Sequence, residues 1–274
     1  MPHPTPRTPL IRPPTVRAPL FVLAAVLCAT PAAALQPLIT DDTSTQGSGG
    51  NQLELSLNRS RITTDGVSDR VGSLPVVYTR GLGETVDLYA GAVYVDSRPG
   101  GGSDEARGAG NPTVGAKWRF LETSASGTSA AAKLEFLLPV SGSAEAVGLG
   151  SASTGGNLTL ILSQDLPFGA IHVNASAGRL RYRASGSNPD STPMRLSAAP
   201  VWQLNPQWRL ALDMGAQWVQ SFEQRVRTGF VELGAIWSPD DDLDLALGVI
   251  RTADNQNPRT SALAATVGLT WRFK

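Results

Sequence analysis

Apolar and polar residues alternate along most of the chain from residue 51 onward, which is the pattern of β-strands that have two different faces. The clearest example occupies every second position near the C-terminus: Leu263, Ala265, Val267, Leu269, Trp271 and Phe273. The pattern predicts about twelve strands, at residues 51–61, 73–80, 85–95, 112–121, 129–139, 156–164, 170–182, 193–203, 207–219, 226–237, 242–252 and 261–273. Most have about the ten residues that a tilted membrane-spanning strand needs.

The predicted connections alternate between short and long. Short turns are expected at 81–84, 167–169, 204–206 and 238–241, and longer polar loops at 62–72, 96–111, 140–155, 183–192, 220–225 and 253–260. A transmembrane β-barrel has an even number of strands, short periplasmic turns and longer external loops. A soluble sandwich has no reason to alternate in this way. We therefore predict an all-β protein with a single antiparallel outer-membrane β-barrel over residues 51–274 and both termini in the periplasm.

The tryptophans share the apolar face of their strands. Five of them fall next to the short turns or the C-terminus: Trp118, Trp202, Trp208, Trp237 and Trp271. An indole at a membrane interface buries its ring and keeps its N–H in water. We therefore predict an aromatic girdle at one membrane interface. A soluble core is the alternative, but it gives no reason for tryptophans to gather at one end.

The opposite face of the strands carries polar and charged side chains. They are Lys117, Arg119, Lys133, Glu135, His172, Asn174, Arg195, Arg209, Asp213, Glu232 and Asp244. Each basic residue placed toward lipid near the midplane would cost roughly 2–4 kcal/mol. We therefore expect these residues to line a lumen and to filter and orient a solute there.

Glycines also share the inward face, at positions 91, 115, 215, 234, 248 and 268. One interpretation is space, because a residue without a side chain leaves room for water, a ligand or an inserted segment. The other is that glycine permits the bending of a closed sheet. The sequence leaves both interpretations open.

The first 34 residues have the organisation of a secretory signal peptide. Arg7, Arg12 and Arg17 precede an apolar run at 18–30, and small residues follow at 31–34. We therefore expect an exported chain whose mature part begins at residue 35. The polar stretch 35–50 then precedes the first predicted strand.

Composition narrows the possible functions further. The formal net charge is zero, which argues against a nucleic-acid partner. The single cysteine, Cys28, excludes a disulfide framework and a cysteine-built metal site, and it lies in the predicted signal peptide. We expect no cofactor, no metal and no catalytic residue.

Two segments resemble a known family. The stretch PLITDD at 37–42, with QG at 46–47 and QLE at 52–54, is similar to the mature start of outer-membrane transporters named for the meta-cleavage pathway of phenol degradation. The stretch GNPTVGAKWRF at 110–120 resembles a second hallmark of that family. The resemblance implies an outer-membrane barrel of Gram-negative bacteria with a transport role. The last strand also resembles the signal read by the barrel assembly machinery, with Phe273 as its aromatic residue.

Strand number leaves the state of the lumen open. Barrels of about 8 strands are filled by side chains, whereas those of 16–18 strands enclose a water-filled channel. We predict a channel for passive passage of small solutes, hydrophobic or aromatic compounds among them. The segment 35–50, with Asp41 and Asp42, is a candidate plug or gate inside the barrel. The alternative is a non-conducting barrel that serves a structural or binding role.

A membrane-embedded enzyme is the third class considered. His172 is the only histidine outside the predicted signal peptide, and it shares a strand face with Asn174 and Ser176. A nucleophile and its base usually come from different chain segments, so we predict that the protein is not an enzyme.

Expected partners are outer-membrane lipid and lipopolysaccharide. Arg179, Arg181 and Arg183 alternate at the external end of a predicted strand and are candidates to contact lipopolysaccharide phosphates.

Overall fold

The computed structural model describes residues 36–100, 104–183, 190–221 and 224–274. The predicted signal peptide, residues 1–34, and the predicted first mature residue, Leu35, lie outside the described residues. Among the residues described, no helix combines the length and apolarity that a membrane crossing requires.

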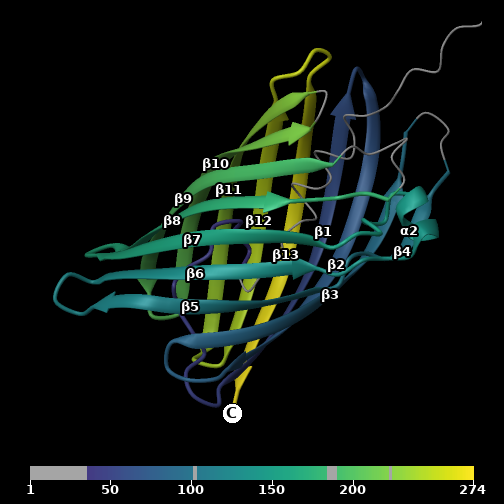
Figure 1. The fold of residues 1–274 in the computed structure, drawn as a ribbon. Coiled ribbons are helices and arrows are strands. Elements are labelled where there is room, and N and C mark those ends of the chain that lie inside the picture. Colours follow the sequence, from purple (N-terminus) through teal and green to yellow (C-terminus); the bar gives the residue numbers. More distant parts are fainter. Residues whose placement is uncertain (1–35, 101–103, 184–189, 222–223) are drawn as a thin grey trace, which may run out of the picture.

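The described chain forms one 13-stranded antiparallel sheet (Figure 1). Its strands are β1 (Asn51–Thr64), β2 (Val67–Gly81), β3 (Val86–Arg98), β4 (Ala106–Ala109), β5 (Thr113–Thr123), β6 (Thr128–Leu137), β7 (Gly155–Leu166), β8 (Gly169–Arg179), β9 (Ser191–Asn205), β10 (Trp208–Ser221), β11 (Arg225–Asp240), β12 (Leu243–Asp254) and β13 (Thr260–Phe273). A short helix, α2 (Gly142–Ala146), lies between β6 and β7.

The sheet closes on itself. Strand β1 pairs with β2 on one side and with β13 on the other, where Asn51 lies opposite Phe273. Strands β4 and β5 pair with successive parts of β3 and together complete one position in the wall. The result is a closed antiparallel barrel with twelve wall positions, which confirms the predicted fold class and strand number.

Alternation along each strand gives the wall its two faces. On β13, Leu263, Val267 and Trp271 point outward and are 58%, 56% and 48% exposed. Between them, Ala264 and Thr270 point inward and are buried. A strand places successive side chains on opposite faces, so closing the sheet puts one set around the outside and the other around the lumen.

Five connections of two to four residues join the strands at the end of the barrel where the C-terminus lies, which we call the short-turn end (Figure 1). They are residues 82–85, 124–127, 167–168, 206–207 and 241–242. Longer connections at the opposite end include 138–154, which contains α2, and 255–259. The predicted alternation of short and long connections is thus largely present.

One predicted long loop, 62–72, is wrong. Strands β1 and β2 continue through it and are joined by Asp65 and Gly66 alone, with φ values of +49° and +77°. A two-residue hairpin turn of type I′ needs positive φ at both central positions, and Asp-Gly is a favoured pair for it. Part of the predicted loop 96–111 is also strand, since β3 runs to Arg98 and β4 follows. The strands of this barrel continue beyond the apolar stretches of the sequence. Polar residues next to those stretches therefore do not by themselves indicate a loop.

Candidate functional site in the barrel lumen

A segment inside the barrel, residues 36–50, precedes β1, and we call it the N-terminal strap. Its residues contact successive inner walls of the barrel in chain order. Pro37 lies beside glycines of β11 and β12, Thr40 reaches β9 and β10, and Gln46 reaches β3. At its end Gly49 donates a backbone hydrogen bond to the Gly81 carbonyl (3.1 Å). The strap therefore follows the inner circumference of the barrel.

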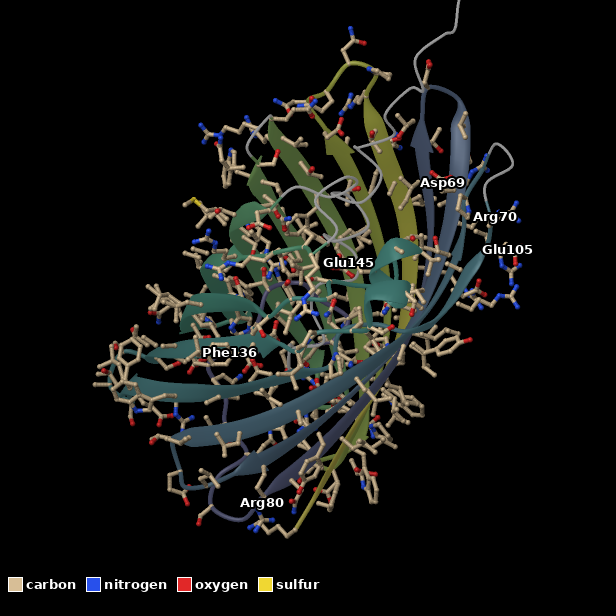
Figure 2. All side chains as sticks on the ribbon, turned by 45° about the vertical axis from the view of Figure 1, so that its right-hand side comes forward. Asp69, Arg70, Arg80, Glu105, Phe136 and Glu145 are labelled. Carbon is tan, nitrogen blue, oxygen red and sulfur yellow. The ribbon has the colours of Figure 1, made fainter. Side chains whose placement is uncertain are left out.

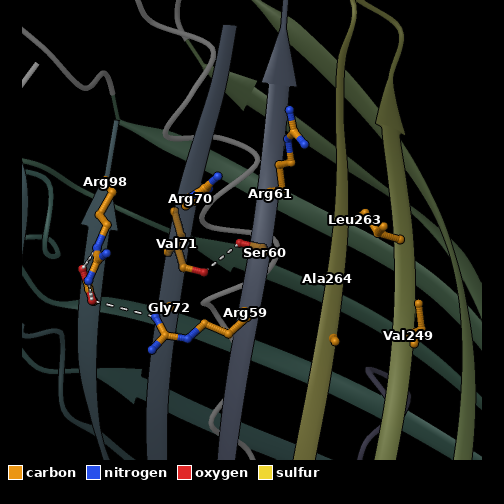
Figure 3. A pocket seen from close by; sticks show the side chains of 12 residues that line it. Arg59, Ser60, Arg61, Arg70, Val71, Gly72, Arg98, Val249, Leu263 and Ala264 are labelled. Carbon is orange, nitrogen blue, oxygen red and sulfur yellow. Dashed lines mark hydrogen bonds and ion pairs between the residues drawn. The ribbon is translucent and has the colours of Figure 1, made fainter. Parts of the chain in front are cut away.

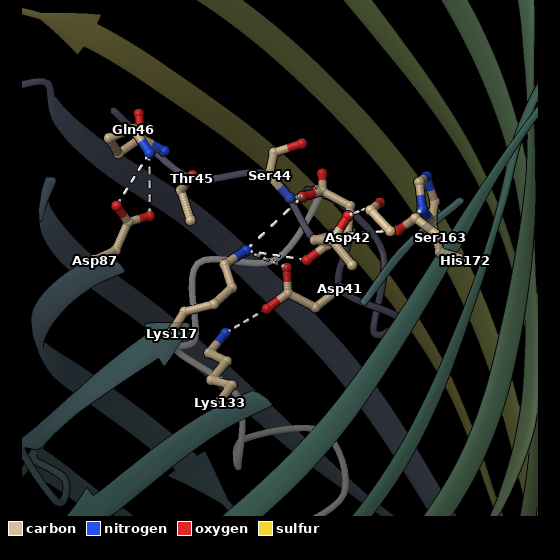
Figure 4. Close-up of polar contacts among 12 residues, drawn as sticks. Asp41, Asp42, Ser44, Thr45, Gln46, Asp87, Lys117, Lys133, Ser163 and His172 are labelled. Atoms are coloured by element: carbon tan, nitrogen blue, oxygen red, sulfur yellow. Dashed lines mark hydrogen bonds and ion pairs between the residues drawn. The ribbon is translucent and has the colours of Figure 1, made fainter. Parts of the chain in front are cut away.

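Two lysines face each other beneath the middle of the strap. Lys117 on β5 lies directly opposite Lys133 on β6, and both side chains are about 5% exposed or less. Like charges directly opposite each other destabilise a sheet. Asp41 of the strap meets both ammonium groups, with Oδ1 3.3 Å from Lys117 Nζ and Oδ2 2.6 Å from Lys133 Nζ (Figure 4). The strap thus supplies a carboxylate that both lysines share, in addition to the wall carboxylate of Asp87, which lies opposite Lys117 across β3 and β5.

The backbone of Asp41 is held as well. In the orientation that satisfies both groups, the Asn174 amide accepts a hydrogen bond from the Asp41 N–H (2.6 Å) and donates one to the Asp41 carbonyl (2.9 Å). Three residues on different strands therefore converge on one residue of the strap. Lys117, Lys133 and Asn174 are all among the predicted lumen residues, and the structure brings them together here.

Asp42 reinforces the same junction. Lys117 Nζ donates to the Asp42 carbonyl (3.1 Å) and lies 3.8 Å from its Oδ1, while Ser44 N–H donates to Oδ1 (2.7 Å). Burial opposes a charge on Asp42, but Lys117, His172 and the Ser44 hydrogen bonds outweigh it and lower the pKa to about 2. Asp42 is therefore ionised at neutral pH.

Hydrogen bonds anchor the strap on both sides of this junction. Thr40 donates from its N–H to Asp213 Oδ2 and from its hydroxyl to Oδ1, both at 2.7 Å. Gln46 N–H donates to Asp87 Oδ1 (3.0 Å), as Figure 4 shows. Asp213 was predicted to line the lumen. Asp87 was not, although it shares the strand face of Gly91, which was predicted to point inward.

A serine and the histidine meet on neighbouring strands. Ser163 on β7 lies opposite His172 on β8, with 2.8 Å between Ser163 Oγ and His172 Nδ1. Ser163 Oγ also accepts a hydrogen bond from Thr43 N–H (3.2 Å). His172 shares its strand face with Asn174 and Ser176, and its hydrogen-bond partner comes from the neighbouring strand. Ser163 of this pair thus contacts the strap. That the protein is not an enzyme stays a prediction.

The glycines of the inward face leave space for other groups. A Cβ added at Gly234 would lie 3.0 Å from Pro37 Cγ, and one at Gly248 would lie 2.8 Å from Pro37 Cβ. At Gly115 and Gly215 an added Cβ would instead run into the rings of Tyr89 and Phe230. Real Cβ atoms do not approach other atoms so closely, so of the two interpretations space applies at these positions.

Apolar side chains also face the lumen, which sequence analysis did not anticipate. Leu38 of the strap packs in a cluster with Ala199, Val201 and Ala211. Toward the end opposite the short turns, a second cluster joins Ile62, Val71, Val95 and Ala262, and Val93 and Leu149 pack against it. Leu149 comes from the connection that carries α2, so this connection reaches inward. The lumen therefore has apolar clusters both beside the strap and beyond it, in addition to the charged junction at Asp41.

The other predicted lumen residues form separate groups. Arg209 and Arg272 both pair with Asp244, at 3.1 and 2.7 Å, close to the short-turn end. Arg119 donates to the Glu84 carbonyl (2.9 Å) at the same end.

The remaining predicted lumen residues are Glu135, Arg195 and Glu232. The Tyr89 hydroxyl donates to Glu135 Oε2 (3.4 Å). Arg195 and Glu232 are inward-facing, and among the described residues Arg195 Nε and Glu232 Oε2 have no hydrogen-bond partner.

The five tryptophans of the predicted girdle lie on the outer face near the short-turn end. They are between 37% and 55% exposed. Trp208 and Trp237 stack with their ring centroids 6.1 Å apart. Phe168 stacks on Trp202 with a centroid distance of 6.0 Å. Their position suits an interfacial role, which stays a prediction, as does the assembly role of Phe273.

No family model and no curated protein matches this chain by sequence. Solved structures do match. An outer membrane channel from Pseudomonas putida F1 has a TM-score of 0.67 at 15% identity and covers 86% of this chain and 100% of its own. The β domain of the Bordetella autotransporter BrkA has a TM-score of 0.53 at 16% identity, covering 82% and 100%. The NanC porin has a TM-score of 0.52 at 10% identity, covering 79% and 98%. The chain therefore has the fold of bacterial outer-membrane β-barrels.

Proposed function

We propose that this protein is a passive outer-membrane channel for small solutes and that the N-terminal strap narrows its lumen. The observation that carries the proposal is the presence of a polypeptide segment inside the barrel. Narrow barrels are filled by the side chains of their own walls. Here the wall encloses room for residues 36–50 in addition to its own side chains.

The way the strap is attached supports a role in controlling passage. Between Gln36 and Gln46 the strap contacts the described part of the wall through ion pairs, apolar contacts and hydrogen bonds that involve a side chain. Backbone pairing with the wall is found among the described residues only near Gly49 and Gly50. Displacing the first part of the strap therefore breaks no strand pairing of the barrel.

The lining favours small solutes with an apolar part. A solute from the end opposite the short turns meets Ile62, Val71 and Val95 before it reaches the charged junction at Asp41. Apolar walls with a few placed polar groups are typical of small-molecule sites. Hydrophobic or aromatic solutes fit this arrangement, and so does the resemblance to the meta-pathway transporters.

The proposal places the short-turn end in the periplasm, with both termini on that side. The tryptophans then lie at the inner interface of the outer membrane, where aromatic girdles occur. Phe273 at the end of β13 would present the assembly signal to the barrel assembly machinery.

A non-conducting barrel is the second candidate, and one observation favours it. Lys117, Lys133 and Asp41 are almost fully buried around their ion pairs. Removing one partner of a buried ion pair costs several kcal/mol. The ion pairs therefore favour a strap that stays in the lumen. In this case the protein would have a structural or binding role in the envelope.

Single-channel conductance separates the two candidates. We would refold residues 35–274, confirm the barrel by heat-dependent gel mobility, and record in planar bilayers. A second protein lacks residues 36–46 but keeps Gly49 and Gly50, which pair with Gly81. We expect discrete conductance steps that are larger in the deletion protein. Silence from both folded proteins would refute the channel, and equal steps would refute the narrowing role of the strap.

A further inference from the structure

A groove on the outer face of the barrel is lined by four arginines on one side and by apolar residues on the other. It spans β1, β2, β3, β12 and β13 and has a volume of about 540 Å³. Arg59, Arg61, Arg70 and Arg98 line one part (Figure 3). Val249, Leu263 and Ala265 line the other. Outward-facing charges are unusual on a membrane barrel because lipid surrounds this face.

Strand register produces the cluster. Arg61 lies opposite Arg70 across β1 and β2, and Arg70 lies opposite Arg98 across β2 and β3. In the next row Arg59 lies opposite Gly72, which lies opposite Asp96. A side chain at Gly72 would collide with the Arg59 guanidinium. Glycine at this position therefore lets Arg59 lie across β2 toward Asp96.

The arginines outnumber the acids available to them. Asp96 serves three arginines, at 3.8 Å from Arg59, 3.1 Å from Arg98 and 3.4 Å from Arg107. Arg61 donates to Ser68 Oγ (3.1 Å).

Arg70 stands out within this cluster, because its guanidinium has no ion pair or hydrogen bond within the described part of the chain. It lies near one end of the barrel, and Arg80 lies near the other (Figure 2). The groove therefore keeps an excess of positive charge and at least one uncommitted donor group.

The height of the groove matches a membrane boundary in the orientation proposed above. Trp271 of the girdle lies opposite Leu53 on β1. Arg59 and Arg61 follow on the same face, and a strand tilted by about 40° rises about 2.5 Å per residue along the membrane normal. They therefore lie about 15 and 20 Å above the girdle, whereas the apolar band of such barrels is about 25 Å tall. The row of Arg61, Arg70 and Arg98 thus lies about 5 Å below the outer edge of that band, within reach of the outer-leaflet headgroups, and Arg59 lies deeper.

We propose that this groove binds the phosphorylated sugar headgroup of lipid A in lipopolysaccharide. Arginine forms bidentate, charge-assisted hydrogen bonds with phosphate. Arg61, Arg70 and Arg98 take the phosphate, and the acyl chains run down the apolar surface that begins at Leu263 and Val249. This site lies on β1–β3, apart from Arg179, Arg181 and Arg183 on and after β8, the candidates from sequence.

The test uses the folded mature chain in detergent and fluorescently labelled lipopolysaccharide. Arg61→Gln with Arg70→Gln should weaken binding about tenfold, in keeping with the loss of two charge-assisted contacts. The matched control changes Arg225 and Arg227 to Gln. These two arginines are exposed on the outward face of β11 at the same end. Arg61→Lys with Arg70→Lys should recover part of the affinity. Heat-dependent gel mobility verifies that each variant is folded.

Further arms identify the ligand. Lipid A stripped of its phosphates should compete at least tenfold more weakly than intact lipid A, and inorganic phosphate should not compete at similar concentrations. Unchanged binding by the glutamine variant, an equal loss in the control, or effective competition by inorganic phosphate would each overturn the proposal. The inference rests on the proposed orientation but not on solute passage. The assay records no conductance, so a silent barrel leaves its result unaffected.

Discussion

Replacing Asp41 by Asn should release the strap from the barrel wall. The substitution keeps the size of the side chain and removes the charge that lies 3.3 Å from Lys117 Nζ and 2.6 Å from Lys133 Nζ. The two lysines would then face each other across β5 and β6 without their shared carboxylate. Removing one partner of a buried ion pair costs about 3–5 kcal/mol.

The lower end of that range applies here. Lys133 retains other contacts, including one with the Tyr89 ring, whose centroid is 5.2 Å from Nζ. Lys117 retains the Asp42 carbonyl at 3.1 Å. A loss of about 3 kcal/mol would raise the ratio of released to bound strap by about 150-fold, since 1.4 kcal/mol corresponds to a factor of ten.

A thiol placed on the strap can report its release. Cys28 is the only cysteine and lies outside residues 35–274, so Leu38→Cys would introduce a unique thiol. Leu38 is buried, with 4% exposure. A bulky maleimide should label it slowly in the otherwise native barrel and about 100-fold faster, or more, when Asp41→Asn is added, if labelling follows the released fraction.

Two controls make this result specific to the ion pairs. The first is Asp42→Asn. The Asp42 carboxylate lies 3.8 Å from Lys117 Nζ and is more exposed than that of Asp41, so its removal should increase labelling less. Adding Lys117→Met and Lys133→Met to Asp41→Asn removes the uncompensated charges and should restore protection. The same labelling rate with and without Asp41→Asn, in folded barrels, would show that these ion pairs do not hold the strap.

Three further predictions address other parts of the site. Gly234→Val should displace Pro37 and raise channel conductance without shortening the strap, whereas unchanged conductance would mean that the neighbouring wall can yield. The pKa of Asp42 is lowered from 3.8 to about 2. Its contribution to strap binding is therefore complete above about pH 4 and is lost as the pH falls toward 2. The labelling rate of Leu38→Cys, measured with an acid-compatible thiol reagent, should therefore rise as the pH falls from about 4 toward 2. Loss of the Asp42 charge should cause no change in this rate at higher pH. Asp244→Asn should lower the temperature of the gel-mobility transition, because Arg209 and Arg272 lose their shared partner; no change would indicate that water already compensates them.

Local sequence was sufficient for the faces of the strands. The inward positions of Lys117, Asp213 and Asp244 and the outward positions of the tryptophans follow from the two-residue period, which is a property of extended backbone. The hairpin at Asp65 and Gly66 could also be predicted from the sequence, because Asp-Gly is a turn signal. Sequence analysis predicts a loop there instead, because polar residues flank this pair on both sides.

Contacts between strands depend on the register of their pairing, which the two-residue period does not give. Nothing in the strand of His172 indicates that its partner is Ser163, since the choice depends on the register between β7 and β8. The strap presents the same difficulty, because Thr40 and Asp213 are far apart in the chain and meet only inside a closed barrel.

The sequence by itself determined that this chain forms strands with one apolar and one polar face, and that their connections alternate in length. Only the tertiary structure decided what the polar face encloses and how charges on separate strands combine. Closure brings β1 beside β13 and places Arg61 opposite Leu263, while the register of β5 with β6 places two lysines beside Asp41. The physical reason is that alternation depends on neighbouring residues, whereas register and closure depend on pairing between residues that the chain separates.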